Sequence, residues 1–207
     1  MTQAFEKNYS IHYEQTSAVW ELSEFLLQWI PFDHEKLVFC CIGTDRSTGD
    51  ALGPIVGSQL QQIFSFPFEV VGTLQTPLHA LNIVERHEKL YEQQEPFIVA
   101  IDACLGEASA IGSILIQDGP LYPGKAVNKT LPPIGHLSIK GIVNVGGFME
   151  AKVLANTRLH VTYSMSDKIA RALQLAWQRH LLKRKNNRHN DRNNYNRWQQ
   201  IGYTDFR

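Results

Sequence analysis

Residues 37–56 read LVFCCIGTDRSTGDALGPIV, and this stretch decides the fold class. Its first six residues, 37–42, form an uninterrupted apolar run that ends at Gly43, which is typical of a central strand covered on both faces. A polar loop follows, and from Leu52 onward apolar residues recur at helical spacing. Pro54 fits the first turn of that helix, where its missing N–H costs nothing. A buried strand, a short loop and a helix are the beginning of a βαβ unit.

The same alternation of apolar runs and helical spacing continues along the chain. Three further apolar runs predict strands: 68–74, 97–101 and 112–117. Residues 136–143 are interpreted as a fifth strand or as part of a loop, and 160–165 as a weak strand. Helical spacing predicts four more helices: 17–30, 77–93, 144–156 and 166–182. Strands that alternate with helices favour βαβ crossovers, so we expect an α/β fold, a three-layer α/β/α sandwich with a mostly parallel twisted sheet.

Length and composition describe an ordinary soluble globular protein. The chain has 207 residues, of which 43% are hydrophobic and 19% charged, with 20 basic residues against 20 acidic ones. These values exclude a coiled coil, a collagen-like chain and a wholly disordered chain. We therefore expect one domain over residues 1–182, of a size that needs no disulfide to complete its core.

The cysteines and the hydropathy of the chain indicate the cellular compartment. Cys40, Cys41 and Cys104 cannot all pair with one another, and each lies in an apolar stretch, which is typical of buried thiols in a reducing compartment. Residues 1–15 lack the apolar core of a signal peptide. No apolar run approaches the ~18 residues of a membrane span. We expect a cytoplasmic protein with no membrane partner.

The balanced net charge hides a basic C-terminus. Residues 179–207 hold eight basic and two acidic side chains, whereas the rest of the chain is acidic. Residues 183–207 are rich in Asn and Arg, and they cannot bury enough apolar surface to offset the entropy of ordering. We predict a flexible basic tail there. Its simplest interpretation is a solvated extension, and nucleic acid, acidic protein or anionic lipid are the alternative contacts.

Acidic residues follow two of the predicted strands. The loop after the first strand contains Asp45 and Asp50, and Asp102 is the first residue beyond the strand at 97–101. In open α/β sheets, sites lie outside the carboxyl ends of the strands, so we expect Asp50 and Asp102 to face one site. Two close carboxyls do not both ionise easily. Such a pair can share a proton, activate water and protonate a leaving group.

Other interpretations of these residues stay open at this point. An Asp near the start of a helix commonly caps free N–H groups, which is the structural interpretation of Asp50. A phosphate-binding loop is a further interpretation, but GxGxxG and GxxxxGK[ST] are absent and the carboxylates would repel a phosphate. His136 lies in a loop and is interpreted either as an exposed or hydrogen-bonded structural residue or as a ligand or base.

The order of the motifs resembles one protein family. Three stretches are similar to the YyaC-type sporulation proteins of endospore-forming bacteria, and the resemblance covers residues 15–182. They are LVFCCIGTDRSTGDALGPIVGSQL, FIVAIDACLG and the segment from SILIQDGPLYPGKAVNKT to NVGGFMEAKVLANTRLH. That family is similar to the spore germination protease, an aspartic-type endopeptidase on an α/β/α fold shared with hydrogenase-maturation endopeptidases. The resemblance implies that Asp50, in DALGP, and Asp102, in AIDA, are the essential acidic residues.

The resemblance also implies the residues that line the site. A PG…GNK loop of the germination protease resembles PGKAVNK here, so Asn128 is expected to line the site together with Asp45 and Ser47. Lys129 is expected to be a charge stabiliser. The leading expectation is therefore an aspartic-type endopeptidase that hydrolyses a spore protein with carboxylate-activated water and without a cofactor.

Two alternatives to this cofactor-free peptidase remain. In the hydrogenase-maturation branch, acidic residues and a His bind a metal, which implies a metal-dependent maturation-type endopeptidase with a divalent transition metal on Asp50, Asp102 and His136. The other alternative is a non-catalytic sporulation protein that binds a partner through the same cleft or the basic tail. In each case the resemblance implies a protein of the forespore with a protein or peptide partner. The germination protease is an oligomer, and this implies self-association.

Overall fold

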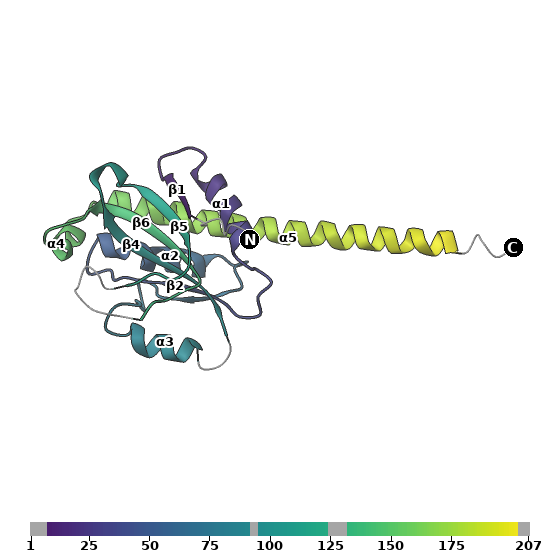
Figure 1. Ribbon diagram of the computed structural model, residues 1–207, viewed down its shortest axis with the longest axis horizontal. Helices are drawn as coiled ribbons and strands as arrows, with labels where there is room; N and C mark the ends of the chain where they lie inside the picture. Colours follow the sequence, from purple (N-terminus) through teal and green to yellow (C-terminus); the bar gives the residue numbers. More distant parts are fainter. Residues whose placement is uncertain (1–7, 92–94, 124–131, 203–207) are drawn as a thin grey trace, which may run out of the picture.

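The computed structural model describes residues 8–91, 95–123 and 132–202, and it contains a six-stranded sheet with helices on both faces (Figure 1). The strands are β1 (Asn8–His12), β2 (Leu37–Cys41), β3 (Glu69–Val71), β4 (Phe97–Gly106), β5 (Ser113–Asp118) and β6 (Leu137–Val145). The helices are α1 (Ala18–Trp29), α2 (Leu52–Gln62), α3 (Ile83–Tyr91), α4 (Glu150–Ala155) and α5 (Leu159–Gly202), with short 3-10 helices η1 (Gly49–Ala51) and η2 (Ala108–Ala110). The predicted three-layer α/β/α sandwich is confirmed.

The sheet is mostly parallel and has an antiparallel edge. Its strand order is β1-β5-β6-β4-β2-β3. β4 lies between β2 and β6 and is parallel to both, and β2 is parallel to β3. β5 is antiparallel to its two neighbours, β6 and β1. The sequence does not predict β1, because its residues NYSIH include a single buried apolar side chain, Ile11, and pairing with β5 specifies the strand.

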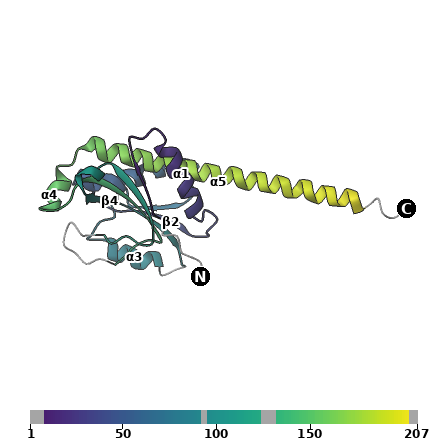
Figure 2. The same ribbon diagram turned by 45° about the horizontal axis from the view of Figure 1, so that its top comes forward.

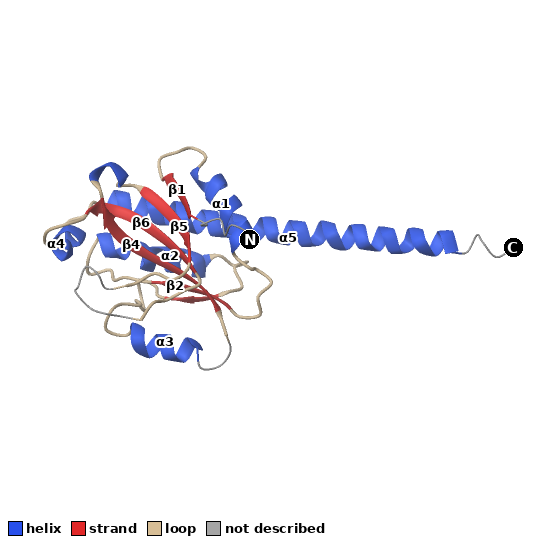
Figure 3. Cartoon of the chain, in the orientation of Figure 1, coloured by secondary structure: helices blue, strands red, loops and turns tan. Residues whose placement is uncertain are grey.

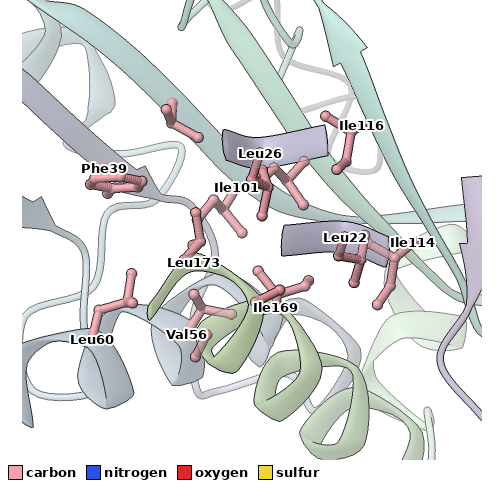
Figure 4. Packing of buried hydrophobic residues seen from close by; sticks show 14 of the residues in the cluster. Leu22, Leu26, Phe39, Val56, Leu60, Ile101, Ile114, Ile116, Ile169 and Leu173 are labelled. Carbon is pink, nitrogen blue, oxygen red and sulfur yellow. The ribbon is translucent and has the colours of Figure 1, made fainter. Parts of the chain in front are cut away.

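One face of the sheet is covered by α1, α2 and α5. Figure 4 shows this core, in which side chains of the three helices meet side chains of β2, β4 and β5: Leu22, Leu26, Val56, Leu60, Ile169, Leu173, Phe39, Ile101, Ile114 and Ile116. None of these side chains is more than 1% exposed. Complete burial of an aliphatic or aromatic side chain contributes about 1.5–3 kcal/mol, so this layer is a main source of stability.

The opposite face of the sheet has a smaller core beneath α3. Figure 2 shows α3 on the side of the sheet away from α1 and α5. The residues buried there come from β2, β4, α3 and the turn before it: Val38, Cys40, Ile98, Ala100, Leu78, Ile83 and Leu90. On β4 these positions lie in the amino half of the strand. Further along the same face, Asp102 and Cys104 are only partly buried.

Residues 160–165 are helical, so the weak strand predicted there is wrong. They belong to the first turns of α5, where Met165 is fully buried in the core under the sheet. The hydroxyl of Ser166 donates to the main-chain oxygens of Thr162, at 2.8 Å, and of Leu52, at 3.1 Å. The β-branched and aromatic residues of this segment favour a strand locally, but contacts with α2 and the sheet decide for a helix.

Helix α5 continues past the sheet as far as Gly202, so residues 183–202 have a helical backbone (Figure 3). No Pro and no Gly interrupt the helix before Gly202, which explains why it extends into a polar segment. Just past the predicted domain end at 182, Arg184 still pairs with Asp33 at 2.8 Å. Flexibility of the tail relative to the domain stays a prediction. No helix of the described segments has the length and apolar character to cross a membrane.

Candidate active site

A hydrogen bond within the loop and two glycines help to hold the loop between β2 and α2. The Thr44 N–H donates to the main-chain oxygen of Asp50 at 3.1 Å, which closes the loop. Gly43 has a φ of 135°, and a Cβ there would collide with the same Asp50 oxygen. A Cβ at Gly53 would collide with the main-chain oxygen of Ile42. Glycine at both positions therefore lets the loop hold Asp50 against the end of β2.

Asp102 lies inside β4, beside the segment that leads into this loop. The Ile42 N–H donates to the main-chain oxygen of Ile101 at 2.7 Å, so the two segments are paired directly before Asp102. The sequence prediction that Asp102 follows the strand is wrong, because pairing with β6 extends β4 to Gly106. Side chains alternate along a strand, so Asp102 is on the same face as Ala100. It therefore lies beyond the part of that face that α3 covers.

Asp50 is not a helix cap. The N-cap of η1 is Thr48 and that of α2 is Ala51, and no side chain caps either helix by a hydrogen bond. The structural interpretation of Asp50 as a cap is therefore wrong. Its carboxyl makes no capping hydrogen bond, and the backbone hydrogen bond that it accepts comes from Thr44 in the preceding loop.

The carboxyls of Asp50 and Asp102 are electrostatically coupled. Burial raises the pKa of Asp102 well above its usual value, and the charge of Asp50 raises it further. A hydrogen bond from the Ala103 N–H to Oδ1, at 2.8 Å, and the charge of Lys140 lower the pKa of Asp102 without offsetting burial. Burial also raises the pKa of Asp50, against the lowering effect of a backbone hydrogen bond with Thr44. Such a pair favours a state in which one carboxyl is protonated and the other ionised.

Three more polar side chains surround the pair. Lys140 on β6 is the register partner of Asp102 on β4. Burial and the charge of Asp102 raise the pKa of Cys104 to about 11, and the charge of Lys140 acts against them. The charge of His79 lowers the pKa of Asp50. The sequence reasoning missed Lys140, although a single charged residue within the apolar run HLSIKGIV could have marked it.

Of the four lining residues that the resemblance implies, the structure describes two. The Ser47 side chain lies in the loop with its Oγ buried and without a hydrogen-bond partner. Buried hydroxyls are nearly always paired, so this one is an unusual feature of the loop. The Asp45 side chain is exposed. Asn128 and Lys129 lie outside the described residues, and their part in the site stays a prediction.

His136 does not lie next to the two aspartates. It lies at the start of β6, where its Nδ1 accepts a hydrogen bond from the Ile98 N–H at 3.1 Å and its ring stacks on Phe97. Ile98 precedes Asp102 by four residues, which is about 13 Å along a strand. The donor set Asp50, Asp102 and His136 therefore does not form. Among the described residues, no group of three or more His, Cys, Asp or Glu could hold a metal ion.

Comparisons with known proteins identify the family. Residues 10–172 match the family described as "Protein of unknown function (DUF1256)". The chain belongs to this family. It is also 50% identical, over 142 residues, to "Uncharacterized protein YyaC" of Bacillus subtilis (strain 168), an alignment that covers 68% of this chain and 69% of the relative. The resemblance to YyaC-type proteins is thereby confirmed.

The DUF1256 match contains Asp50, Asp102 and Lys140, and it ends before the part of α5 that projects from the sheet (Figure 1). Among solved structures, the chain is similar to a [NiFe] hydrogenase maturation protease, HycI, from Thermococcus kodakarensis KOD1. The two share 18% identity with a TM-score of 0.35, over 67% of this chain and 92% of the other. A likeness at this level supports no statement about function.

Proposed function

We propose that this DUF1256 protein is an aspartic-type endopeptidase in which Asp50 and Asp102 activate water. The observation that carries the proposal is the coupling of the two carboxyls, since the charge of Asp50 raises the pKa of Asp102. Coupled, partly buried carboxyls beside the ends of parallel strands can supply one acid and one base at the same pH. Asp50 caps neither η1 nor α2 by a side-chain hydrogen bond, which also supports a role in chemistry.

The reaction follows from a proton held between two carboxyls. The ionised carboxyl accepts a proton from water while the water oxygen attacks the carbonyl carbon of a peptide bond. The C–N bond then breaks as the protonated carboxyl donates its proton to the departing nitrogen. The products are a carboxylic acid and an amine, and the pair again holds one proton. Because a coupled pair titrates as a unit, the base and the acid are properties of the pair.

We propose that the substrate is a spore protein and that cleavage takes place in the forespore. This part of the proposal is supported by the resemblance to YyaC-type sporulation proteins and, through them, to the germination protease. The latter degrades small acid-soluble spore proteins, so these are the first substrates to try. Spore-coat proteins are the second set.

A cleavage assay tests the proposal. The purified full chain is incubated with both sets of spore proteins, and new termini are identified by mass spectrometry. We expect the wild type to cleave, and Asp50→Asn and Asp102→Asn to fold but lose cleavage by about 10²-fold or more. The matched control is Asp118→Asn, which changes an exposed carboxyl at the end of β5 and should cleave like the wild type.

The other outcomes of this assay separate the alternatives. Cleavage that survives both substitutions contradicts the proposal. Cleavage that a chelator abolishes favours the metal-dependent alternative. A wild type that cleaves nothing, but retains a protein from forespore extract, favours the non-catalytic binding protein.

A further inference from the structure

Lys140 lies beside the carboxyl pair without a partner of its own. In the parallel pairing of β4 and β6 it is opposite Asp102, so both side chains leave the sheet on the same face. Its side chain is partly buried. In the part of the chain that the structure describes, it forms neither a hydrogen bond nor an ion pair. An ammonium group that is partly withdrawn from water favours a ligand with negative charge.

The positive charge of Lys140 acts on two other groups of the site. It lowers the pKa of Asp102 and also that of Cys104, which follows Asp102 by two residues on the same face of β4. The backbone at Lys140 is held by a central strand, because β6 pairs with β4 on one side and β5 on the other. A side chain that starts from a paired strand has its backbone position set before the substrate arrives, which favours catalysis.

A positive group at this place suits the hydrolysis of a peptide bond. When water attacks the carbonyl carbon, the electron pair of the C=O bond moves to the oxygen, which becomes an oxyanion. The ionised carboxyl loses its negative charge as it accepts the proton from water, so the negative charge of the site moves to the carbonyl oxygen. A cation within reach of that oxygen stabilises the charge in its new place.

We infer that Lys140 is a catalytic residue whose Nζ binds the carbonyl oxygen of the scissile peptide bond and stabilises the oxyanion. This inference rests on the proposed function. No proton leaves Lys140 and no bond to it forms. The C=O bond re-forms when the C–N bond breaks, and the carboxyl pair carries both proton transfers. The resemblance assigns the stabilising charge to Lys129, so the two lysines are competing candidates.

Steady-state kinetics on a cleaved spore protein test the role of Lys140. We expect Lys140→Met to lower kcat by about 10²–10³-fold with little change in KM, because the oxyanion exists only in the transition state. Lys140→Arg should retain part of the activity. The control Lys152→Met removes an exposed lysine of α4 and should behave as the wild type. Unchanged kcat in Lys140→Met, or a loss confined to Lys129→Met, overturns the inference.

A second measurement does not depend on cleavage. Cys40 and Cys41 are fully buried, so Cys104 is the accessible thiol of the three, and its alkylation by iodoacetate and by iodoacetamide can be followed by peptide mass spectrometry. If Lys140 faces the site, Lys140→Met lowers the iodoacetate rate relative to the iodoacetamide rate by about threefold or more. Lys152→Met leaves the ratio unchanged. An unchanged ratio in Lys140→Met shows that its charge does not face the site, and it overturns the inference.

The two measurements separate the inference from the proposed function. If the wild type cleaves and Lys140→Met cleaves equally well, the function stands and the role of Lys140 falls. If the wild type cleaves nothing, the proposed function fails and the catalytic role fails with it. The alkylation ratio then decides whether Lys140 binds anions at the site.

Discussion

Asp50, within η1, and Asp102, within β4, form one electrostatic unit in which the charge of the first raises the pKa of the second. The unit depends on backbone contacts made by residues around it. The Ile42 N–H bonds to Ile101 just before Asp102, and the Thr44 N–H closes the loop onto Asp50. The carboxyls are therefore held together by the same pairing that builds the centre of the sheet.

The raised pKa of Asp102 predicts how stability depends on pH. The folded protein binds this proton more tightly than the unfolded chain does, whose carboxyl has a pKa near 4. The resulting contribution to stability is fully present below that ordinary pKa, and it is lost as pH rises through the raised folded-state pKa. We therefore expect Asp102→Asn, which cannot ionise, to have a higher free energy of unfolding than the wild type at about pH 8, by an amount that shrinks toward about pH 5.

Urea unfolding across this pH range measures the difference. Asp118→Asn, at an exposed position, serves as the control and should follow the wild type. An Asp102→Asn variant that is less stable than the wild type at about pH 8 would show that the ionised carboxyl is favourable in the fold, contrary to its burial.

The loop before Asp50 should tolerate no side chain at Gly43. A Cβ there would collide with the main-chain oxygen of Asp50, and the φ of 135° is unfavourable for any other residue. We expect Gly43→Ala to lower the free energy of unfolding by about 3 kcal/mol or more. Gly146→Ala is the matched control, because its nearest atoms would lie 3.5 Å from the added Cβ. Equal stability of the two variants in urea unfolding would disprove this account of the loop.

Arg179 connects α5 to α1. Its Nη1 donates to the Ser23 hydroxyl at 3.0 Å, its Nη2 pairs with Glu24, and its guanidinium lies 4.3 Å from the ring centre of Trp20. We expect Arg179→Met to lower the free energy of unfolding by about 1–2 kcal/mol, with Arg179→Lys between that variant and the wild type. For comparison, Arg171→Met removes an exposed i,i+4 pair and should cost about 0.5 kcal/mol at most. Similar losses in Arg179→Met and Arg171→Met would contradict the prediction.

The projecting end of α5 should be dispensable for the fold. A chain that ends at Lys185 keeps the pairing of Arg184 with Asp33 and the buried core residues of α5, the last of which is Trp177. We expect its melting temperature to lie within about 2 °C of that of the full chain.

The same truncation tests nucleic acid as the alternative to a solvated tail. If the tail contacts nucleic acid, the full-length protein binds duplex DNA with an affinity that falls steeply with salt, and the truncated chain does not bind. DNA binding that is insensitive to salt, or that survives truncation, would rule this contact out.

The α/β fold could be predicted because its central strands have a recognisable apolar sequence pattern. Residues 37–42 and 97–101 are apolar throughout, as strands covered on both faces must be. β1 could not be predicted, since pairing with β5 rather than its own composition specifies it. The helical state of residues 160–165 could not be predicted from these residues alone, for a related reason. Their β-branched side chains favour a strand, whereas burial of Met165 in the shared core stabilises a helix.

The site could be predicted only in part. Asp50 and Asp102 follow from the rule that sites lie at the carboxyl ends of parallel strands. This rule does not predict Lys140 as a site residue. Its position opposite Asp102 depends on the register of β6 against β4, and these two strands are far apart in sequence. His136 was assigned to a metal set by resemblance, whereas its main-chain pairing with Ile98 holds it at the other end of β4.

Titration of the aspartate carboxyls by carbon-13 NMR tests the central claim most directly, because it needs no substrate. The coupled pair predicts two titration steps for Asp50 and Asp102 together, with the upper step above the ordinary carboxyl range of about 3–5. In Asp50→Asn, the pKa of Asp102 should fall, since the charge that raises it is gone. Independent titration of both carboxyls near 4, with no change of Asp102 in Asp50→Asn, would contradict the account.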